Sequence, residues 1–286
     1  MKIRAIGLDM DGTLLNSNNR VDKTGLELLE QLRENGVYVF LSTGRTKLEI
    51  HDVIHENFLV DGMITSNGAG CYTKDSTLLE APIKFSQVEK IISVAREHGM
   101  YYEVHPFLEE RMAYREDLLI FRKLFYNEYN FSTSKHWLNF FRTAFETKVR
   151  WVDTLPNIPI AKLLFFHTDK NKIKDFRKKL KQLKEDNNFS ISSSSEHNVE
   201  IVNEHVTKAT GLKQFLKKFQ LTPDELIVFG DSENDLPMFN LAKHAVAMKN
   251  ASEHIKEQAD DVTDYTNDEH GVFRYIKDNK NIFHFE

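Results

Sequence analysis

The chain has 286 residues, more than the roughly 100–200 of one domain, so two domains are expected. Its formal net charge of −5 argues against a nucleic-acid or membrane-surface binder, because such proteins normally carry a basic excess. A single cysteine, Cys71, excludes an internal disulfide, and the apolar run after Met1 is too short for a signal peptide or a membrane span. We therefore expect a cytoplasmic protein.

The N-terminal part of the chain alternates between strand-like and helix-like runs. Leu26, Leu29 and Leu32 recur at three-residue intervals and predict a helix that ends at Gly36. Strands that alternate with helices indicate βαβ units and a parallel sheet. The expected strands are 3–9, 37–43 and 62–70, and the expected helices are 23–36 and 45–57.

After Pro82 the pattern changes, because the segment 119–145 is rich in aromatic residues and lacks the alternation. The first pattern returns near residue 204. We therefore expect a core formed by residues 1–83 and 204–286, with a second domain, 84–203, inserted into it. The further expected strands are 100–106, 161–168, 189–195, 198–203 and 225–231, and the further expected helices are 86–99, 172–186, 208–220 and one that begins at 235.

Two carboxylates, Asp9 and Asp11, stand two residues apart where the first expected strand ends. Residues i and i+2 of an extended segment point to the same side, so both can face one site. That site would lie at the carboxyl edge of the sheet, where ligands of open parallel sheets bind. Because neighbouring carboxylates raise each other's pKa unless a cation lies between them, and because oxygen ligands suit Mg²⁺, the pair indicates a magnesium site.

A second acidic cluster, 231–235, follows the expected strand 225–231. Two acidic clusters at two strand ends can surround one hard cation. A third strand ends in Thr43 and Gly44, just before a helix whose N-terminal N–H groups and dipole favour a phosphate. The sequence thus offers carboxylates for a metal and a separate site for an anion.

Each motif also has an ordinary structural interpretation. Asp11 and Gly12 alone are typical of a hairpin turn, and the stretch 42–45 alone more often caps a helix. Calcium loops begun at Asp9 or Asp231 are excluded, because glycine and glutamate are missing from their sixth and twelfth places. The functional interpretation depends on finding three such motifs, each at a strand end, in one chain.

The stretches DMDGTLL, STGR, VTKATGL and GDSENDLPMF resemble, in this order, the four motifs of the haloacid-dehalogenase-like (HAD) phosphatases. The insertion between the second and third motifs is similar to the α/β cap of the Cof-type subfamily, subclass IIB. The resemblance implies a HAD-like, Rossmann-like α/β core with a parallel sheet and an inserted α/β cap domain. It further implies a Mg²⁺-dependent phosphatase that acts on small phosphorylated metabolites. One difference is that Ala209 follows Lys208, where the family usually has glycine.

The resemblance also implies a role for each motif residue. Asp9 would be the nucleophile that forms an aspartyl-phosphate, and Asp11 the general acid and then the general base. Mg²⁺ would be held by Asp9, the backbone carbonyl of Asp11, and Asp231, with Asp235 behind these ligands. The residues implied in phosphate binding are the Met10 backbone, Thr43, Gly44, Lys208 and Asn234.

Other candidate sites have simpler interpretations. His51 and His55 have helical i, i+4 spacing but lack the glutamate of an HExxH motif, which favours a solvated helix face. The lysine-rich stretch 170–184 has its apolar residues on one face, so its lysines are expected to face water. The aromatic segment 121–145 is expected to form the core of the inserted domain. Possible substrate contacts in that domain are Tyr101, Tyr102, His105 and Arg111.

Two alternatives to the phosphatase stay open at this point. A phosphomutase of the same fold would transfer the phosphoryl group to a sugar in preference to water. A phospho-aspartate signalling receiver would also use paired carboxylates, a hydroxyl and a lysine, but it carries its aspartate well inside a shorter domain. A dehalogenase is disfavoured because its chemistry needs neither Asp11 nor a metal. The sequence leaves open the physiological substrate, the cap residues that select it and the oligomeric state.

Overall fold

The computed structural model describes residues 3–51, 53, 59–126, 133–185 and 188–283. The chain forms two compact units, one of Met1–Glu80 with Val206–Glu286 and one of Ala81–His205. We call the first the core unit and the second the inserted unit. Among the described residues, no helix is long and apolar enough to cross a membrane.

The core unit is an eight-stranded sheet with helices on both faces. Its strands are β1 (Ala5–Asp9), β2 (Tyr38–Ser42), β3 (Gly62–Thr65), β4 (Gly70–Tyr72), β5 (Thr77–Glu80), β12 (Leu226–Gly230), β13 (His244–Ala247) and β14 (Asp261–Val262). Its α-helices are α1 (Lys23–Glu34), α2 (Lys47–His51), α7 (Lys208–Lys218), α8 (Leu236–Phe239), α9 (Glu253–Lys256) and α10 (Gly271–Asp278).

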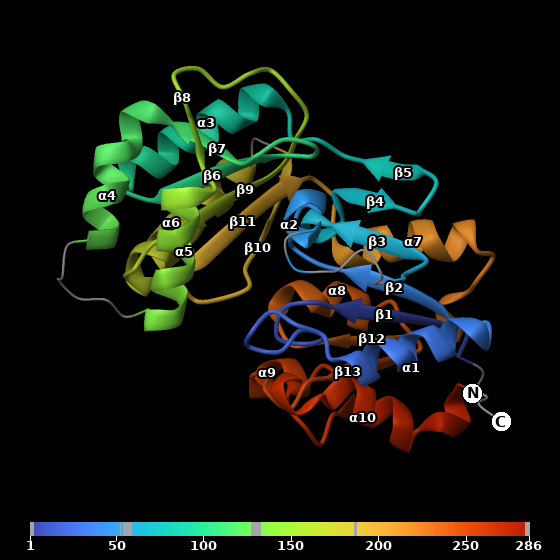
Figure 1. The fold of residues 1–286 in the computed structure, drawn as a ribbon. Helices are drawn as coiled ribbons and strands as arrows, with labels where there is room; N and C mark the ends of the chain where they lie inside the picture. The colour runs from blue at the N-terminus through green and yellow to red at the C-terminus, as the bar shows by residue number, and fades with distance from the viewer. Residues whose placement is uncertain (1–2, 52, 54–58, 127–132, 186–187, 284–286) are drawn as a thin grey trace. The chain divides into compact units, whose positions relative to one another are not determined.

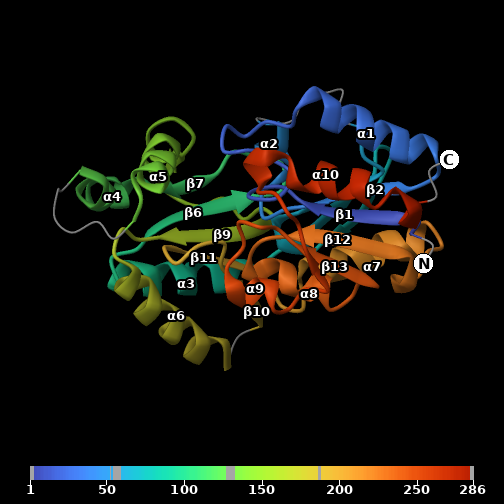
Figure 2. The same ribbon diagram turned by 90° about the horizontal axis from the view of Figure 1, so that it is seen from below.

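The strand order of this sheet is β14-β13-β12-β1-β2-β3-β4-β5. All neighbours from β14 to β3 are parallel, whereas β3, β4 and β5 pair antiparallel. Helices α1 and α10 cover one face, and α7 and α8 cover the other (Figures 1 and 2). The prediction of an α/β fold with a parallel sheet is confirmed, and the carboxyl ends of β1, β2, β3 and β12 lie along one edge.

The buried face of α1 differs in part from the expected one. Leu29 and Leu32 are buried as expected, but Leu28, and not Leu26, completes the apolar stripe. Asp22 caps the helix by accepting a hydrogen bond from the Gly25 amide at 2.7 Å. The buried stripe therefore follows the i, i+3, i+4, i+7 pattern counted from Gly25, which a search at three-residue intervals alone does not detect.

The inserted unit is a six-stranded sheet with helices on both faces (Figure 2). The strand order is β10-β11-β9-β6-β7-β8, antiparallel except for the β7–β8 pair. Its strands are β6 (Tyr101–Pro106), β7 (Met112–Tyr114), β8 (Arg150–Val152), β9 (Ile160–Phe166), β10 (Phe189–Ser192) and β11 (Asn198–Asn203). Its helices are α3 (Phe85–Glu97), α4 (Leu118–Tyr126), α5 (Lys135–Thr147) and α6 (Lys170–Glu185).

The aromatic segment forms much of the core of the inserted unit, as predicted. Phe121 and Phe125 of α4 and Phe141 of α5 are buried against the ring of Tyr101 on β6. Phe141 also stacks on Phe166 of β9, with ring centroids 4.0 Å apart. Such a cluster buries its aromatic faces and leaves them unavailable for stacking on bases.

Two further predictions concern helix faces. The lysine-rich helix α6 buries Ile173, Phe176 and Leu180, so its apolar face packs inward as expected. His51 is exposed at the end of α2. His55 lies outside the described residues.

Two adjacent phenylalanines of α5, one buried and one exposed, allow a test of the aromatic core. Phe141 is 1% exposed and Phe140 is 39% exposed. We expect Phe141→Ala to lower the free energy of unfolding by ~3–5 kcal/mol, because it removes buried surface and leaves a cavity. The matched control, Phe140→Ala, should cost under ~1 kcal/mol. Urea denaturation followed by circular dichroism measures both, and similar losses for the two variants would contradict the assigned core.

Candidate active site

Several polar side chains meet at the carboxyl edge of the core sheet. Asp9 is the last residue of β1, Asp231 directly follows β12, and Lys208 is the first residue of α7. These three residues come from distant parts of the sequence and are brought together because β1 pairs with β12 and α7 packs on that sheet. Residues of three of the four predicted motifs therefore converge at one edge of the sheet.

Lys208 lies at the centre of this cluster and is fully buried. Its Nζ donates to Asp9 Oδ1 at 2.5 Å and to Asp235 Oδ1 at 2.6 Å. Burial alone would lower the pKa of Lys208, but Asp235 and Asp9 more than offset burial and raise it. The lysine thus remains an ammonium ion despite its burial.

The position of Lys208 opposes the local helix electrostatics. A cation in the first turn of a helix meets the positive end of the helix dipole. Thr207 nevertheless caps α7 with a reciprocal pair of hydrogen bonds to Thr210. The helix start is therefore fixed by its cap, and the two carboxylates stabilise a charge that the helix itself disfavours.

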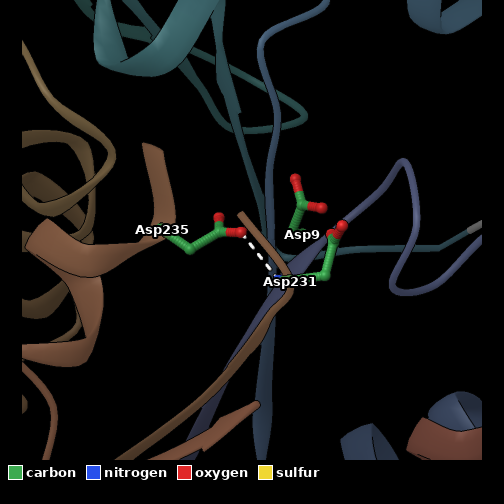
Figure 3. Close-up of side chains that lie close together, drawn as sticks. All are labelled: Asp9, Asp231 and Asp235. Carbon is green, nitrogen blue, oxygen red and sulfur yellow. Dashed lines mark hydrogen bonds between the residues drawn. The ribbon is translucent and has the colours of Figure 1, made fainter. Parts of the chain in front are cut away.

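The carboxylates of Asp231 and Asp9 lie next to each other (Figure 3). Asp231 Oδ1 accepts a hydrogen bond from Thr13 Oγ1 at 3.0 Å. Gly12, with φ of +80°, lies so close that a Cβ there would stand 2.5 Å from Asp231 Oδ2. The glycine after Asp11 is thus required both by its left-handed backbone and by the close approach of Asp231.

Asp235 organises the turn that carries Asp231. Its Oδ2 accepts from the backbone amides of Asp231, at 2.9 Å, and Ser232, at 3.0 Å, the former drawn in Figure 3. Its Oδ1 contacts Lys208. Asp235 is wholly buried, so its oxygens are engaged with the protein on both sides.

The cluster carries more negative than positive charge. With Asp9, Asp231 and Asp235 ionised and Lys208 protonated, these four groups sum to −2. Burial, Asp235 and Asp231 raise the pKa of Asp9, against the opposing effect of Lys208. Burial and the charge of Asp235 likewise raise the pKa of Asp231 to about 7.

The residues present fit a hard divalent cation. One carboxylate oxygen from each of Asp9, Asp231 and Asp235 lies within 4.8 Å of the others. The donor set consists of oxygens, which suits Mg²⁺. A charge of +2 would also offset the excess of −2 and lower the raised pKa values.

Asp11 lies in the turn that follows β1, and it is exposed. Its carboxylate points to Arg45, which donates Nε to Oδ2 at 2.8 Å and Nη2 to Oδ1 at 2.6 Å. Arg45 belongs to the predicted STGR motif, but sequence reasoning gave it no role. Its signal in the sequence was its position directly after Thr43 and Gly44.

The predicted phosphate-binding residues flank this cluster. Thr43 is buried one residue beyond Ser42, the register partner of Asp9. Its Oγ1 accepts from the Arg45 amide at 3.1 Å, and Gly44 lies between them. Met10 is buried after β1, and its carbonyl accepts from two amides of the following turn.

Asn234 has a partner that sequence reasoning missed. Its Nδ2 donates to Asn67 Oδ1 at 3.0 Å, and its Oδ1 accepts from Ser232 Oγ at 2.5 Å. Asn67 is buried in the turn after β3 with φ of +55°. The sequence signal was Asn67-Gly68 directly after a strand, a pair that favours left-handed backbone.

Three of the four possible substrate contacts in the inserted unit gather around one buried carboxylate, Glu103. Tyr101 Oη donates to it at 2.6 Å, His105 Nε2 lies at 2.8 Å and Arg111 Nη1 at 3.0 Å. Burial alone would raise the pKa of Glu103, but Arg111 and His105 lower it to about 2. Tyr102 instead donates to Asp117.

Comparison with known proteins identifies the family to which this chain belongs. Residues 6–276 match the sequence profile of a family described as haloacid dehalogenase-like hydrolase. Phosphatase YwpJ of Bacillus subtilis is 29% identical over 96% of this chain and 99% of its own length. From the same organism, 5-amino-6-(5-phospho-D-ribitylamino)uracil phosphatase YwtE is 27% identical over 96% of this chain and 97% of its own.

A solved structure has a similar fold. A haloacid dehalogenase-like hydrolase from B. subtilis superimposes with a TM-score of 0.80 and 26% identity. The match covers 96% of this chain and 99% of that one. The resemblance therefore extends over both units of the chain.

Asp231→Asn tests the electrostatic description of the cluster. A carboxyl whose pKa rises from 3.8 to about 7 on folding contributes stability below its unfolded pKa, and this stability is lost as the pH rises through 7. With a metal chelator present, we expect Asp231→Asn to raise the melting temperature clearly more at pH 8.5 than at pH 5. Thermal denaturation at both pH values measures the difference.

An exposed carboxylate of the same unit, Asp75, provides the control. Asp75→Asn should leave the pH dependence of the melting temperature as in the wild type. An equal effect of Asp231→Asn at both pH values would contradict the buried charge excess.

Proposed function

Because the chain belongs to the haloacid dehalogenase-like hydrolase family and is a phosphoric monoester hydrolase, we propose that it is a Mg²⁺-dependent phosphatase of small phosphorylated metabolites. Members of this family use a divalent metal, and the acidic cluster could hold one. The observation that carries the proposal is the buried pair of Asp9 and Lys208 beside Asp231. The match to a hydrolase family and to a named phosphatase excludes a signalling receiver without hydrolase activity.

Mg²⁺ would be held by Asp9, the backbone carbonyl of Asp11, and Asp231. When bound, it would offset the charge of the carboxylates and polarise a phosphoryl oxygen. Asp235 supports this arrangement because it accepts from the backbone amide of Asp231 and so orients the turn.

The remaining motif residues would bind the phosphoryl group. Its transfer spreads negative charge over three oxygens, so catalysis depends on positioning and on electrostatic stabilisation. Lys208 supplies a positive charge next to Asp9. Thr43 Oγ can donate its proton, Asn234 has a second amide proton, and the backbones of Met10 and Gly44 would contribute N–H groups.

The reaction would proceed in two displacements. In the first, a carboxylate oxygen of Asp9 attacks phosphorus, the ester P–O bond breaks, and Asp11 donates a proton to the departing oxygen. In the second, Asp11 accepts a proton from water as that water attacks phosphorus, which releases phosphate and restores Asp9. Two neighbouring aspartates are therefore both needed.

We further propose sugar-phosphate-like monoesters as the substrate class and the inserted unit as the cap that selects among them. The relative YwtE is named for an aminouracil with a phosphorylated ribityl chain, so the phosphate named there is an ester of a small polyol chain. The inserted unit also has its own aromatic core, as expected for a separate domain. Phosphoryl transfer to an added sugar in preference to water would instead mark a phosphomutase.

Asp9→Asn and Asp11→Asn separate the two proposed roles. We expect Asp9→Asn to abolish turnover of every phosphate ester, because no aspartyl-phosphate can form. Asp11→Asn should slow the first step for a sugar phosphate by ~10²–10⁴-fold, because its alkoxide needs a proton. For p-nitrophenyl phosphate the first step should change much less, and a burst of p-nitrophenol should precede slow turnover.

Stopped-flow measurement of both esters, with mass spectrometry of the quenched protein, tests these roles. Equal first-step losses for the two esters would refute the acid role of Asp11. Phosphate found on a residue other than Asp9 would refute the nucleophile.

A further inference from the structure

The pair of Arg45 and Asp11 is a bidentate ion pair in the core unit. Both carboxylate oxygens of Asp11 accept from the guanidinium, at 2.8 and 2.6 Å. The Nη2 group also donates to Asn19 Oδ1 at 3.0 Å. A planar guanidinium that meets both oxygens fixes the plane of the carboxylate as well as its position.

The backbone of Asp11 is held independently of Arg45. The carbonyl of the next residue, Gly12, accepts from Asn250 Nδ2 at 2.8 Å, and the carbonyl of Leu15 accepts from Asn267 Nδ2 at 2.9 Å. Asn250 and Asn267 are themselves joined by a hydrogen bond of 3.0 Å. The turn that carries Asp11 is thus anchored by contacts that do not involve Arg45.

Arg45 is anchored as well. Its amide donates to Thr43 Oγ1 at 3.1 Å, and its carbonyl accepts from the Ser66 amide at 2.8 Å. These contacts tie Arg45 to the ends of β2 and β3. Its guanidinium is therefore presented to Asp11 from a part of the site that the sheet itself fixes.

The exposed fractions of the two side chains indicate why a contact that holds the Asp11 carboxylate matters. The side chain of Asp11 is 47% exposed, whereas that of Arg45 is 16% exposed. A half-exposed aspartate samples several rotamers in water, and a catalytic group that is misplaced by about 1 Å can lose ~10²-fold in rate. The more buried arginine therefore restricts the more exposed aspartate.

We propose that Arg45 is a positioning residue that orients the Asp11 carboxyl group for proton transfer to the leaving-group oxygen. The inference rests on the proposed function, because it assumes that Asp11 exchanges the proton. It assigns Arg45 no direct contact with the substrate. The guanidinium acts through Asp11, so its loss matters only for esters whose departure needs the proton.

Phenyl phosphate and p-nitrophenyl phosphate test this directly, because they are similar in size but differ in the basicity of the phenolate they release. We expect Arg45→Lys to slow the first step for phenyl phosphate by ~10–100-fold and for p-nitrophenyl phosphate by under ~3-fold. Lysine keeps the charge but cannot form the bidentate pair. Single-turnover release of each phenol measures the first step, with Mg²⁺ at saturation.

Two further variants refine the test. Asn19 has φ of +56°, so glycine can adopt the same backbone, and Asn19→Gly removes the side-chain oxygen that accepts from Arg45 Nη2. This variant should give a smaller loss with the same ester preference. Arg45→Ala should regain first-step rate with phenyl phosphate when methylguanidinium is added. Arg33, which pairs bidentately with Asp61 in the same unit, gives the matched control Arg33→Lys, for which both esters should react as in the wild type.

The outcomes are distinct. Equal losses for the two esters in Arg45→Lys, unchanged rates for both, or a rise in KM alone would overturn the positioning role. A rise in KM alone would mean that Arg45 binds the substrate. Failure of the wild type to hydrolyse either ester with Mg²⁺ would overturn the proposed function, and the inference with it.

Discussion

The structure of this site depends on the buried contact of Lys208 with Asp9 and Asp235. It joins the end of β1, the start of α7 and the turn after β12. A buried lysine is tolerated only with charged partners, and removal of one partner of such a pair typically costs ~3–5 kcal/mol. The same contact places an ammonium group beside the carboxylate that we propose as the nucleophile. Folding and the proposed chemistry would therefore use the same interaction.

The single positive charge of Lys208 does not neutralise the carboxylates of the site. The three carboxylates, when ionised, exceed the one lysine by two charges, and burial together with the charge of Asp235 raises the pKa of Asp231 to about 7. Asp235 accepts two backbone amides and so orders the turn that presents Asp231. The close approach of Gly12 to Asp231 then fixes the turn that carries Asp11. A divalent cation would complete this arrangement by supplying the missing charge.

Much of the fold and of the site could be predicted because the signals are local. The strands before Asp9 and Asp231 are short apolar runs that end in carboxylates, and a sheet edge brings such ends together. The antiparallel strands β4 and β5 were not predicted, because Gly70–Tyr72 and Thr77–Glu80 are too short to show a pattern. The same holds for β7 and β8, which are three residues each.

The side-chain pairs of the site lay beyond sequence reasoning for a different reason. Arg45 meets Asp11 across 34 positions of sequence, and Asn234 meets Asn67 across 167. Neither pair has a periodic signal, since each arises only when strand ends are aligned. The roles of the motif residues came from a resemblance and stay predictions, whereas their assembly at one sheet edge is visible in the structure.

The central claim is that a divalent cation offsets the charge of the carboxylate cluster. Isothermal titration calorimetry of Mg²⁺ binding, in buffers of different ionisation enthalpy, measures the protons released for each ion bound. The pKa of Asp231, raised to about 7, predicts proton release at pH 6 that is clearly greater than at pH 8.5, and less release in Asp231→Asn. Binding without proton release at pH 6, or equal release at both pH values, would contradict the account.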